Sequence, residues 1–354
     1  MLAKTGREMN GWRISLKMNR RELLVQGSQV GLLAASIPSR LLVSARISPY
    51  SPLPSGPGVD RFKQAERKLL RRYGVTAKSR FVTLESSSLP AHVLEAGKGP
   101  PIILIHGGGL SGCSWAQLLA PLQQNYHAFA PDLPGCGLTY RIDFRGLPFR
   151  RTAQNLINEI MDALHLPSAI VIGHSMGGYF ALVFALAHPE RVSQLVLIGE
   201  PAGSSPPSQW RRLAGGLDMR VFEHETMDDT RHDWGSVIAA HIERVSSELL
   251  DADNAQRNLP GYAASWNSML DQLLSEKDLG LTYGLKPELK TLRPSTLFIW
   301  GDKDFFGPPT GGQEMAALAP HARCEVVADA GHAVWIDQPD RCRKSVTAFL
   351  LGKS

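Results

Sequence analysis

Short apolar runs recur from residue 102 onward, and they constrain the fold more than any other feature of the sequence. Each run is followed within two residues by glycine, aspartate or glutamate, and helical patterns such as 153–164 and 176–187 lie between them. The runs occupy residues 102–105, 128–131, 169–172, 195–198 and 296–300. Buried strands that alternate with helices form βαβ units. We therefore predict an α/β fold with a mostly parallel central sheet flanked by helices.

Two alternating segments, 81–85 and 92–95, precede these runs and predict a hairpin. In parallel sheets of this kind, ligands bind beyond the carboxyl ends of the strands. The residues that follow each predicted strand therefore form the set in which functional side chains are expected.

The segment Gly173-His174-Ser175-Met176-Gly177-Gly178 follows one predicted strand and precedes a predicted helix. It fits the pattern G-x-S-x-G, in which a sharp strand-to-helix turn exposes a serine hydroxyl. Glycines flank the serine because the turn leaves no room for neighbouring Cβ atoms. The helix that follows points its N-terminus at the site and favours a developing anion there. Ser175 is thus the predicted nucleophile.

Glycines also follow the run at 102–105, in His106-Gly107-Gly108-Gly109. A backbone N–H from this loop, together with the N–H of Met176, can stabilise an oxyanion. We expect His106 and His174 to brace the two loops through hydrogen bonds. Asp132, after the next strand, is expected to have a structural role.

A carboxylate and a histidine complete the predicted set. Trp300-Gly301-Asp302-Lys303-Asp304 ends one predicted strand, and Gly331-His332 lies in a loop after another predicted strand, 324–327. The chain order Ser175, Asp304, His332 matches the order of nucleophile, acid and histidine in α/β-hydrolases.

Taken together, the motifs resemble those of the α/β-hydrolase superfamily, in its capped, esterase-like serine-hydrolase branch. They are H-G-G-G at 106–109, D-L-P-G at 132–135, G-H-S-M-G-G at 173–178, W-G-D-K-D at 300–304 and G-H-A-V-W-I-D-Q-P at 331–339. The resemblance implies Ser175, Asp304 and His332 as the catalytic triad, with Asp302 and Glu200 as alternative acids. It implies the N–H groups of Gly108 and Met176 as the oxyanion hole, with Gly107 as the alternative to Gly108.

Departures from related families narrow the predicted reaction. Dehalogenases and epoxide hydrolases of this fold use an aspartate nucleophile, whereas this chain has Ser175. Proline iminopeptidases usually carry Trp where this chain has Met176. Carbon–carbon bond hydrolases of ring-cleavage pathways tend to have Asn before the nucleophile and Trp after the histidine, where this chain has His174 and Ala333.

We therefore predict hydrolysis of a carboxylic ester or a related small-molecule acyl substrate through an acyl-enzyme intermediate. No cofactor or metal is expected. A carbon–carbon bond hydrolase and a non-catalytic small-molecule-binding protein are the alternatives.

Residues 202–290 lack short apolar strands and are predicted to form a helical cap, inserted after the sixth strand and covering an apolar pocket. Predicted helices include 236–250 and 263–274. The hydrolase core is then 81–201 and 291–354.

The N-terminal segment, 1–58, ends in a proline-rich linker and contains Arg20-Arg21 before an apolar run. With small residues at Val43 and Ala45, it resembles a twin-arginine export signal. We expect a periplasmic or secreted protein; otherwise the protein is cytoplasmic. The sequence leaves open whether Met1 or Met18 is the start.

Residues 59–80 are predicted to form a basic amphipathic helix whose periodic part ends at Tyr73, with Gly74 at the C′ position. We expect it to pack on the body, with its basic face in solvent or, alternatively, on an anionic membrane surface.

The formal charge of +5 is unevenly distributed. Residues 1–58 and 59–80 each carry eight basic and two acidic residues, whereas residues 81–354 carry 22 basic and 29 acidic ones. The body is therefore acidic, which argues against nucleic-acid binding. No apolar run is long enough for stable membrane insertion. The sequence leaves open the oligomeric state and any disulfides among Cys113, Cys136, Cys324 and Cys342.

Overall fold

A computed structural model describes residues 50–51, 55–199, 201, 220–274 and 284–352. The predicted export signal and both candidate start residues lie outside these ranges. None of the helices in the described ranges is long and apolar enough to cross a membrane.

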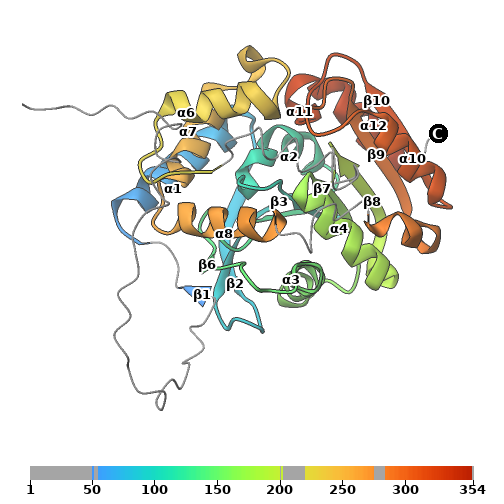
Figure 1. The fold of residues 1–354 in the computed structure, drawn as a ribbon, viewed down its shortest axis with the longest axis horizontal. Coiled ribbons are helices and arrows are strands. Elements are labelled where there is room, and N and C mark those ends of the chain that lie inside the picture. The colour runs from blue at the N-terminus through green and yellow to red at the C-terminus, as the bar shows by residue number, and fades with distance from the viewer. Residues whose placement is uncertain (1–49, 52–54, 200, 202–219, 275–283, 353–354) are drawn as a thin grey trace, which may run out of the picture. The chain divides into compact units, whose positions relative to one another are not determined.

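The centre of the protein is an eight-stranded sheet with the strand order β10-β9-β8-β7-β4-β5-β3-β2 (Figure 1). All neighbours run parallel except β2–β3 and β3–β5. This confirms the predicted α/β-hydrolase fold. The strands are β2 (Ala77–Thr83), β3 (Pro90–Ala96), β4 (Pro101–Ile105), β5 (His127–Pro131), β7 (Ala169–His174), β8 (Val192–Ile198), β9 (Ser295–Gly301) and β10 (Ala322–Val327).

Alternate residues of each central strand face two separate apolar layers, as the period of a strand requires. In β4, Ile102 and Leu104 pack into one layer, and Ile103 and Ile105 pack into the other. The first layer is covered by α1 (Pro57–Arg72), α2 (Ala116–Leu122), α11 (Val334–Asp337) and α12 (Pro339–Leu350). The second is covered by α3 (Phe149–Ala163), α4 (Met176–Ala187) and α10 (Thr310–Leu318).

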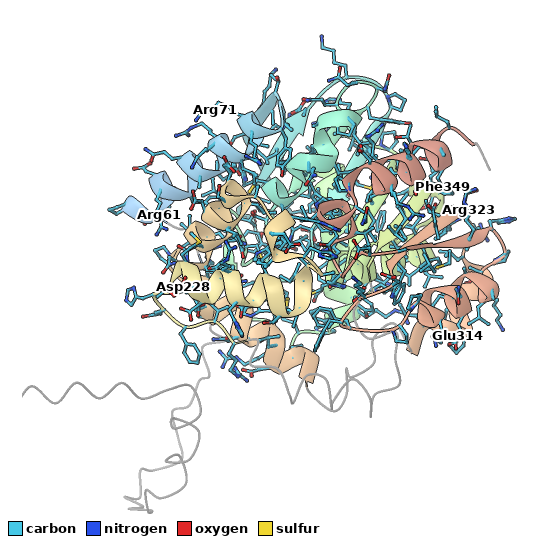
Figure 2. All side chains as sticks on the ribbon, turned by 90° about the horizontal axis from the view of Figure 1, so that it is seen from above. Arg61, Arg71, Asp228, Glu314, Arg323 and Phe349 are labelled. Atoms are coloured by element: carbon cyan, nitrogen blue, oxygen red, sulfur yellow. The ribbon has the colours of Figure 1, made fainter. Side chains whose placement is uncertain are left out.

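Smaller elements complete the core. A two-stranded sheet joins β1 (Tyr50–Ser51) to β6 (Arg141–Ile142). The guanidinium of Arg323, in β10, lies 5.3 Å from the ring centre of Phe349 in α12 (Figure 2). Short 3₁₀ helices are η1 (Gly112–Trp115), η2 (Pro189–Arg191) and η5 (Lys286–Thr291).

The helices between β8 and β9 follow the sixth strand of the main sheet, where a cap was predicted. They are α6 (Met227–Asp233), η3 (Trp234–Ile238), η4 (Ile242–Arg244), α7 (Ser247–Arg257) and α8 (Tyr262–Leu274). The prediction for 263–274 is confirmed. The prediction of one helix over 236–250 is wrong, because the backbone is extended at Ala239 and the side chain of Ser246 caps a new helix by accepting the N–H of Leu249.

Helix α1 packs on the body, as predicted, but its bounds differ from the predicted 59–80. It begins at Pro57, inside the predicted linker, and it ends at Arg72 because Gly74 adopts a φ of 68°. The N–H of Val75 then bonds to the carbonyl of Leu70, which closes the helix end. Residues 77–80 belong to β2 instead.

Part of the basic face of α1 contacts α7 (Figure 1). Arg61, visible on α1 in Figure 2, donates to Asn254 at 2.7 Å. Lys68 and Arg72 form ion pairs with Asp251 and Glu248 at 3.3 and 3.2 Å. This part of the face therefore docks α1 on α7.

Candidate active site

A strained turn joins β7 to α4 at Ser175. The residue has φ 52° and ψ −121°, and it occupies the N-cap of α4. A Cβ on Gly177 would lie 2.3 Å from the carbonyl oxygens of Ile105 and His106, and one on Gly173 would lie 2.5 Å from the oxygen of Gly177. Only glycine fits these two positions, as the motif predicts. The turn leaves the side chain of Ser175 half-buried among otherwise buried neighbours.

His332 and Asp304 are brought together from the loops after β10 and β9. The histidine Nδ1 lies 2.9 and 3.0 Å from the two carboxylate oxygens. Because a carboxylate only accepts, Nδ1 carries the proton and Nε2 is left as an acceptor. This Nε2 is buried and has no hydrogen-bond partner in the described part of the chain.

The structure distinguishes among the predicted acids. Asp302 points elsewhere: its side chain is exposed and accepts the N–H of Ala330 at 3.2 Å. Glu200 lies outside the described residues. Of these two and Asp304, the described structure places only Asp304 against His332.

Backbone contacts place His332 beside the serine turn. The N–H of Ser175 bonds to the carbonyl of Ile198, and Gly199 follows directly. A Cβ on Gly199 would lie 2.6 Å from the His332 carbonyl oxygen and 3.0 Å from its Nδ1. Gly199 has a φ of 72°, so both its conformation and the close approach of His332 require glycine.

The ring of His332 lies between two other rings. Its centroid is 4.5 Å from that of Phe306 and 4.6 Å from that of His174. The ring of His174 contacts Trp335 in turn, at 4.6 Å.

His174 does not brace its loop through hydrogen bonds, contrary to the prediction. Neither ring nitrogen has a hydrogen-bond partner of good geometry among the described residues. Burial, and to a lesser extent the neighbouring His332, lower the pKa of His174 well below its usual value. The neutral ring acts as packing, with Nδ1 only 2.4 Å from where a Cβ on Gly107 would lie.

His106 does brace its loop, as predicted. Its Nδ1 donates to the carbonyl of Gly107 at 2.8 Å, and its Nε2 accepts the N–H of Leu133 at 2.9 Å. Burial lowers the pKa of the ring, which is consistent with a neutral histidine making both bonds.

The glycine loop forms a turn that brings its backbone next to the start of α4. The N–H of Leu110 bonds to the carbonyl of Gly107 at 3.2 Å, and Gly109 has a φ of 73°. A Cβ on Gly108 would lie 2.7 Å from the methyl group of Met176, and one on Gly107 would lie 3.3 Å from Cβ of Ser175. The N–H groups of Gly108 and Met176 have no acceptor within the described ranges. Both glycines proposed for an oxyanion hole are thus near the serine turn.

Comparisons with known proteins agree with this geometry. The sequence profile of the alpha/beta hydrolase family matches residues 102–344. The chain belongs to the alpha/beta hydrolase family. The serine turn and the His332–Asp304 pair lie within the matched range.

Two curated proteins illustrate how this alpha/beta hydrolase relates to others. It is 28% identical over 287 residues to a 2-hydroxy-6-oxononadienedioate/2-hydroxy-6-oxononatrienedioate hydrolase of Comamonas testosteroni, covering 77% of this chain and 96% of that protein. It is 26% identical over 259 residues to a pimeloyl-[acyl-carrier protein] methyl ester esterase of Photobacterium profundum, covering 72% and 96%.

Among solved structures, a meta-cleavage product hydrolase from Pseudomonas fluorescens IP01 superposes with a TM-score of 0.66 at 26% identity. The match covers 77% of this chain and 97% of that one.

A small cavity of about 10 Å³ adjoins the glycine loop of this hydrolase, which is room for about one water molecule. Most of the side chains that line it are apolar. The lining residues are His106, Gly107, Gly108, Gly109, Leu133, Pro134, Cys136, Phe144, Met176, Phe180 and Met269.

Asp132 has the structural surroundings that were predicted for it. Its fully buried carboxylate accepts the N–H groups of Gly112 and Leu138 at 2.7 and 2.8 Å, and it pairs with Nδ1 of His92 at 2.8 Å. Burial alone would raise the pKa of Asp132, but His92 and these hydrogen bonds outweigh it and lower the pKa.

His, Cys, Asp and Glu are the residue types that could hold a metal ion, and cysteines are those that could form disulfides. In the described ranges, no group of three His, Cys, Asp or Glu residues could hold a metal ion. The four cysteines are unpaired: three are buried and Cys324 is half-buried.

Sequence reasoning missed the residue that holds the histidine loop in place. The buried carboxylate of Asp337 accepts the N–H groups of Gly331, Ala240 and His241 at 2.8, 2.9 and 3.1 Å. It therefore ties the loop of His332 to the chain between η3 and η4. The available signal was its position in the motif at 331–339, five residues after His332. The motif itself contains no lysine or arginine that would explain a carboxylate there.

Proposed function

We propose that this protein is a serine hydrolase in which Ser175 attacks a carbonyl carbon, with His332 as the base and Asp304 as its partner. The pairing of His332 Nδ1 with both oxygens of Asp304 carries the proposal, because it leaves Nε2 free to accept a proton beside the serine turn. Asp304 also stabilises the imidazolium that forms.

The oxyanion forms near the start of α4. In this proposal the N–H groups of Gly108 and Met176 receive it, supported by the positive end of the helix. A donor of this kind contributes about 3–4 kcal/mol to the transition state in serine hydrolases that have been tested by mutation. His332 then protonates the leaving group, and water repeats the sequence to release the acid from Ser175.

Two kinds of bond are candidates for cleavage. The first is a carbon–carbon bond beside a ketone, as in the ring-cleavage hydrolases. The Comamonas relative and the Pseudomonas structure, both matched over about three quarters of this chain, favour it.

The second candidate is an ester or related acyl bond with a small apolar acyl group. The mostly apolar side chains around the cavity beside the glycine loop favour it. His174 and Ala333, at positions where ring-cleavage hydrolases tend to have Asn and Trp, favour it too. The methyl ester esterase of Photobacterium shows that an ester-cleaving protein has similar identity to this chain.

A fluorophosphonate probe tests the shared part of the proposal. We expect the full-length protein to be labelled, Ser175→Ala to be unlabelled, and the modified peptide to contain residue 175. A matched control is Ser79→Ala, because Ser79 Oγ also lies 2.7 Å from a histidine, His92, that is paired with an aspartate. Ser79 lies in a strand rather than in a glycine-flanked turn, so its replacement should leave labelling intact.

Activity assays on wild type and Ser175→Ala then distinguish between cleavage of a carbon–carbon bond and cleavage of an ester. Rates on p-nitrophenyl esters of increasing acyl length are compared with rates on a 2-hydroxy-6-oxo-dienoate. If folded wild-type protein is not labelled by the probe and hydrolyses none of these substrates, the hydrolase proposal is contradicted and a small-molecule-binding protein is favoured.

A further inference from the structure

The carbonyl of Gly109, in the glycine loop, is held by two side chains of the cap. The hydroxyl of Tyr262, at the start of α8, donates to it at 2.7 Å. The side-chain amide of Gln256, near the end of α7, donates to it at 2.6 Å. Both side chains are buried, with exposures of 1% and 0%. One carbonyl thus satisfies both of its lone pairs with donors more than 140 residues away in the sequence.

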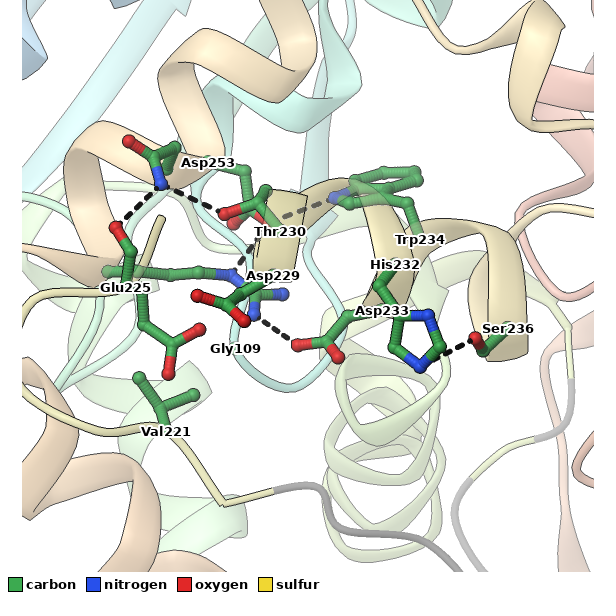
Figure 3. A network of polar contacts seen from close by, with 12 residues as sticks. Gly109, Val221, Glu225, Asp229, Thr230, His232, Asp233, Trp234, Ser236 and Asp253 are labelled. Atoms are coloured by element: carbon green, nitrogen blue, oxygen red, sulfur yellow. Dashed lines mark hydrogen bonds and ion pairs between the residues drawn. The ribbon is translucent and has the colours of Figure 1, made fainter. Parts of the chain in front are cut away.

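A buried network fixes the orientation of the Gln256 amide. Its oxygen accepts the N–H of Gly137 at 3.1 Å, and its nitrogen also donates to Asp253 at 2.9 Å. Asp253 in turn accepts from the indole of Trp234 at 2.8 Å (Figure 3). It also accepts from Arg257 at 3.0 Å. Reversal of the amide would break these bonds, so the cap presents an N–H, and not an oxygen, to Gly109.

The turn from Gly107 to Leu110 is therefore held at both ends. At the first end, the core holds the carbonyl of Gly107 through His106 and through the turn's own bond from Leu110. At the other end, the cap holds the carbonyl of Gly109. The N–H of Gly108 belongs to the same peptide as the Gly107 carbonyl, and the N–H of Leu110 belongs to the same peptide as the Gly109 carbonyl. The bond from Leu110 to Gly107 therefore links the peptide held by the cap to the peptide that carries the Gly108 N–H, and this N–H has no acceptor in the described structure.

We propose that Tyr262 and Gln256 are positioning residues that aim the Gly108 N–H at the oxyanion, so that the seating of the cap sets the strength of the oxyanion hole. This inference rests on the proposed function. The two side chains touch neither substrate nor nucleophile; they act through the Gly109 carbonyl. Removing them leaves that carbonyl without its donors, so the peptide of Gly109 and Leu110 is free to rotate and the bond from Leu110 to Gly107 no longer fixes the Gly108 N–H. An N–H misplaced by a fraction of an ångström loses much of its effect on the transition state.

The experiment compares Tyr262→Phe, Gln256→Met and the double variant with the full-length wild type. The matched control is Ser265→Ala, which removes a buried bond from the same helix α8 to the core, where Ser265 accepts the N–H of Ile142 at 3.1 Å. Each protein is assayed for its rate of fluorophosphonate labelling at Ser175, for kcat and KM on the best p-nitrophenyl ester, and for its melting temperature.

The single variants should lose roughly three- to tenfold in labelling rate and kcat, and the double variant roughly thirty- to a hundredfold, with KM within about twofold of wild type. Ser265→Ala should lower the melting temperature to a similar degree without this loss in kcat. Equal kcat in wild type and double variant, or an equal loss in Ser265→Ala, would overturn the coupling alone. Wild-type protein without any label would overturn the proposed function together with it.

Discussion

Replacing Glu66 with glutamine should remove much of the pH dependence of folding between pH 5 and 8. Glu66 lies on α1 with only 3% of its surface exposed, and its Oε2 has no hydrogen-bond partner among the described residues. Burial raises the pKa of the carboxyl from 4.5 to about 7, which the neighbouring Asp132 reinforces and His92 partly opposes. Lys63 and Arg67 oppose it more weakly.

The sign follows from which state binds the proton. Between pH 4.5 and about 7 the folded protein keeps the Glu66 proton while the unfolded chain has lost it, so the group's contribution to stability is present below pH 4.5 and is lost as the pH rises through about 7. At 1.36 kcal/mol per pKa unit, the shift corresponds to about 3 kcal/mol in total. About 2 kcal/mol of this falls between pH 5 and 8.

Chemical denaturation at pH 5, 6, 7 and 8 measures this effect. The free energy of unfolding of Glu66→Gln, relative to wild type, should rise by about 2 kcal/mol from pH 5 to pH 8, because glutamine has no proton to lose. Glu85→Gln, at an exposed carboxyl, serves as the control and should show no such trend. If the difference between Glu66→Gln and wild type stays constant over this range, Glu66 does not titrate there and the reasoning from its burial is wrong.

Two further predictions concern the candidate site. Asp304→Asn should slow fluorophosphonate labelling by roughly a thousandfold or more without unfolding the protein, because an amide cannot hold His332 in the tautomer that accepts a proton; labelling at the wild-type rate would exclude Asp304 as the acid. Asp337→Ala should lower the free energy of unfolding by about 3 kcal/mol, since one buried and two partly buried N–H groups lose their acceptor. A loss below about 1 kcal/mol in urea denaturation would show that water replaces the carboxylate.

Local patterns were enough to predict the sheet and much of the site. Each apolar run forms a buried strand, because it is short and rich in residues that favour strands, and the glycines around Ser175 mark a turn that other residues cannot adopt. The placement of Asp304 next to His332 followed from the shared edge at which parallel strands end.

Contacts made by distant polar side chains were beyond these patterns. Gln256 and Tyr262 reach Gly109 only because the cap folds over the glycine loop, and no periodicity records such a pairing. His174 was expected to form hydrogen bonds because it lies in a motif loop, yet the packing of aromatic rings determines its place.

The burial of Glu66 is a feature that the sequence analysis did not predict. It lies four residues after Phe62 and four before Leu70, so helical spacing places it on the apolar face of α1, where a charged residue is not expected. The break in the helix predicted over 236–250 was missed for a local reason. Ser246 is a strong N-cap that lies within an otherwise continuous helical pattern.

The docking of α1 against α7 has a practical consequence for anyone who shortens this protein. In its first half, helix α7 forms ion pairs with Arg72 and Lys68 of α1. Near its end, Gln256 donates a hydrogen bond to Gly109. A truncation that starts after Pro57 would remove part of α1 and expose the apolar surface that Phe62 covers. It would also weaken the packing of α7, which holds the carbonyl of Gly109. A shortened protein could then fold and still be a poor enzyme, so the first residue retained should precede Pro57.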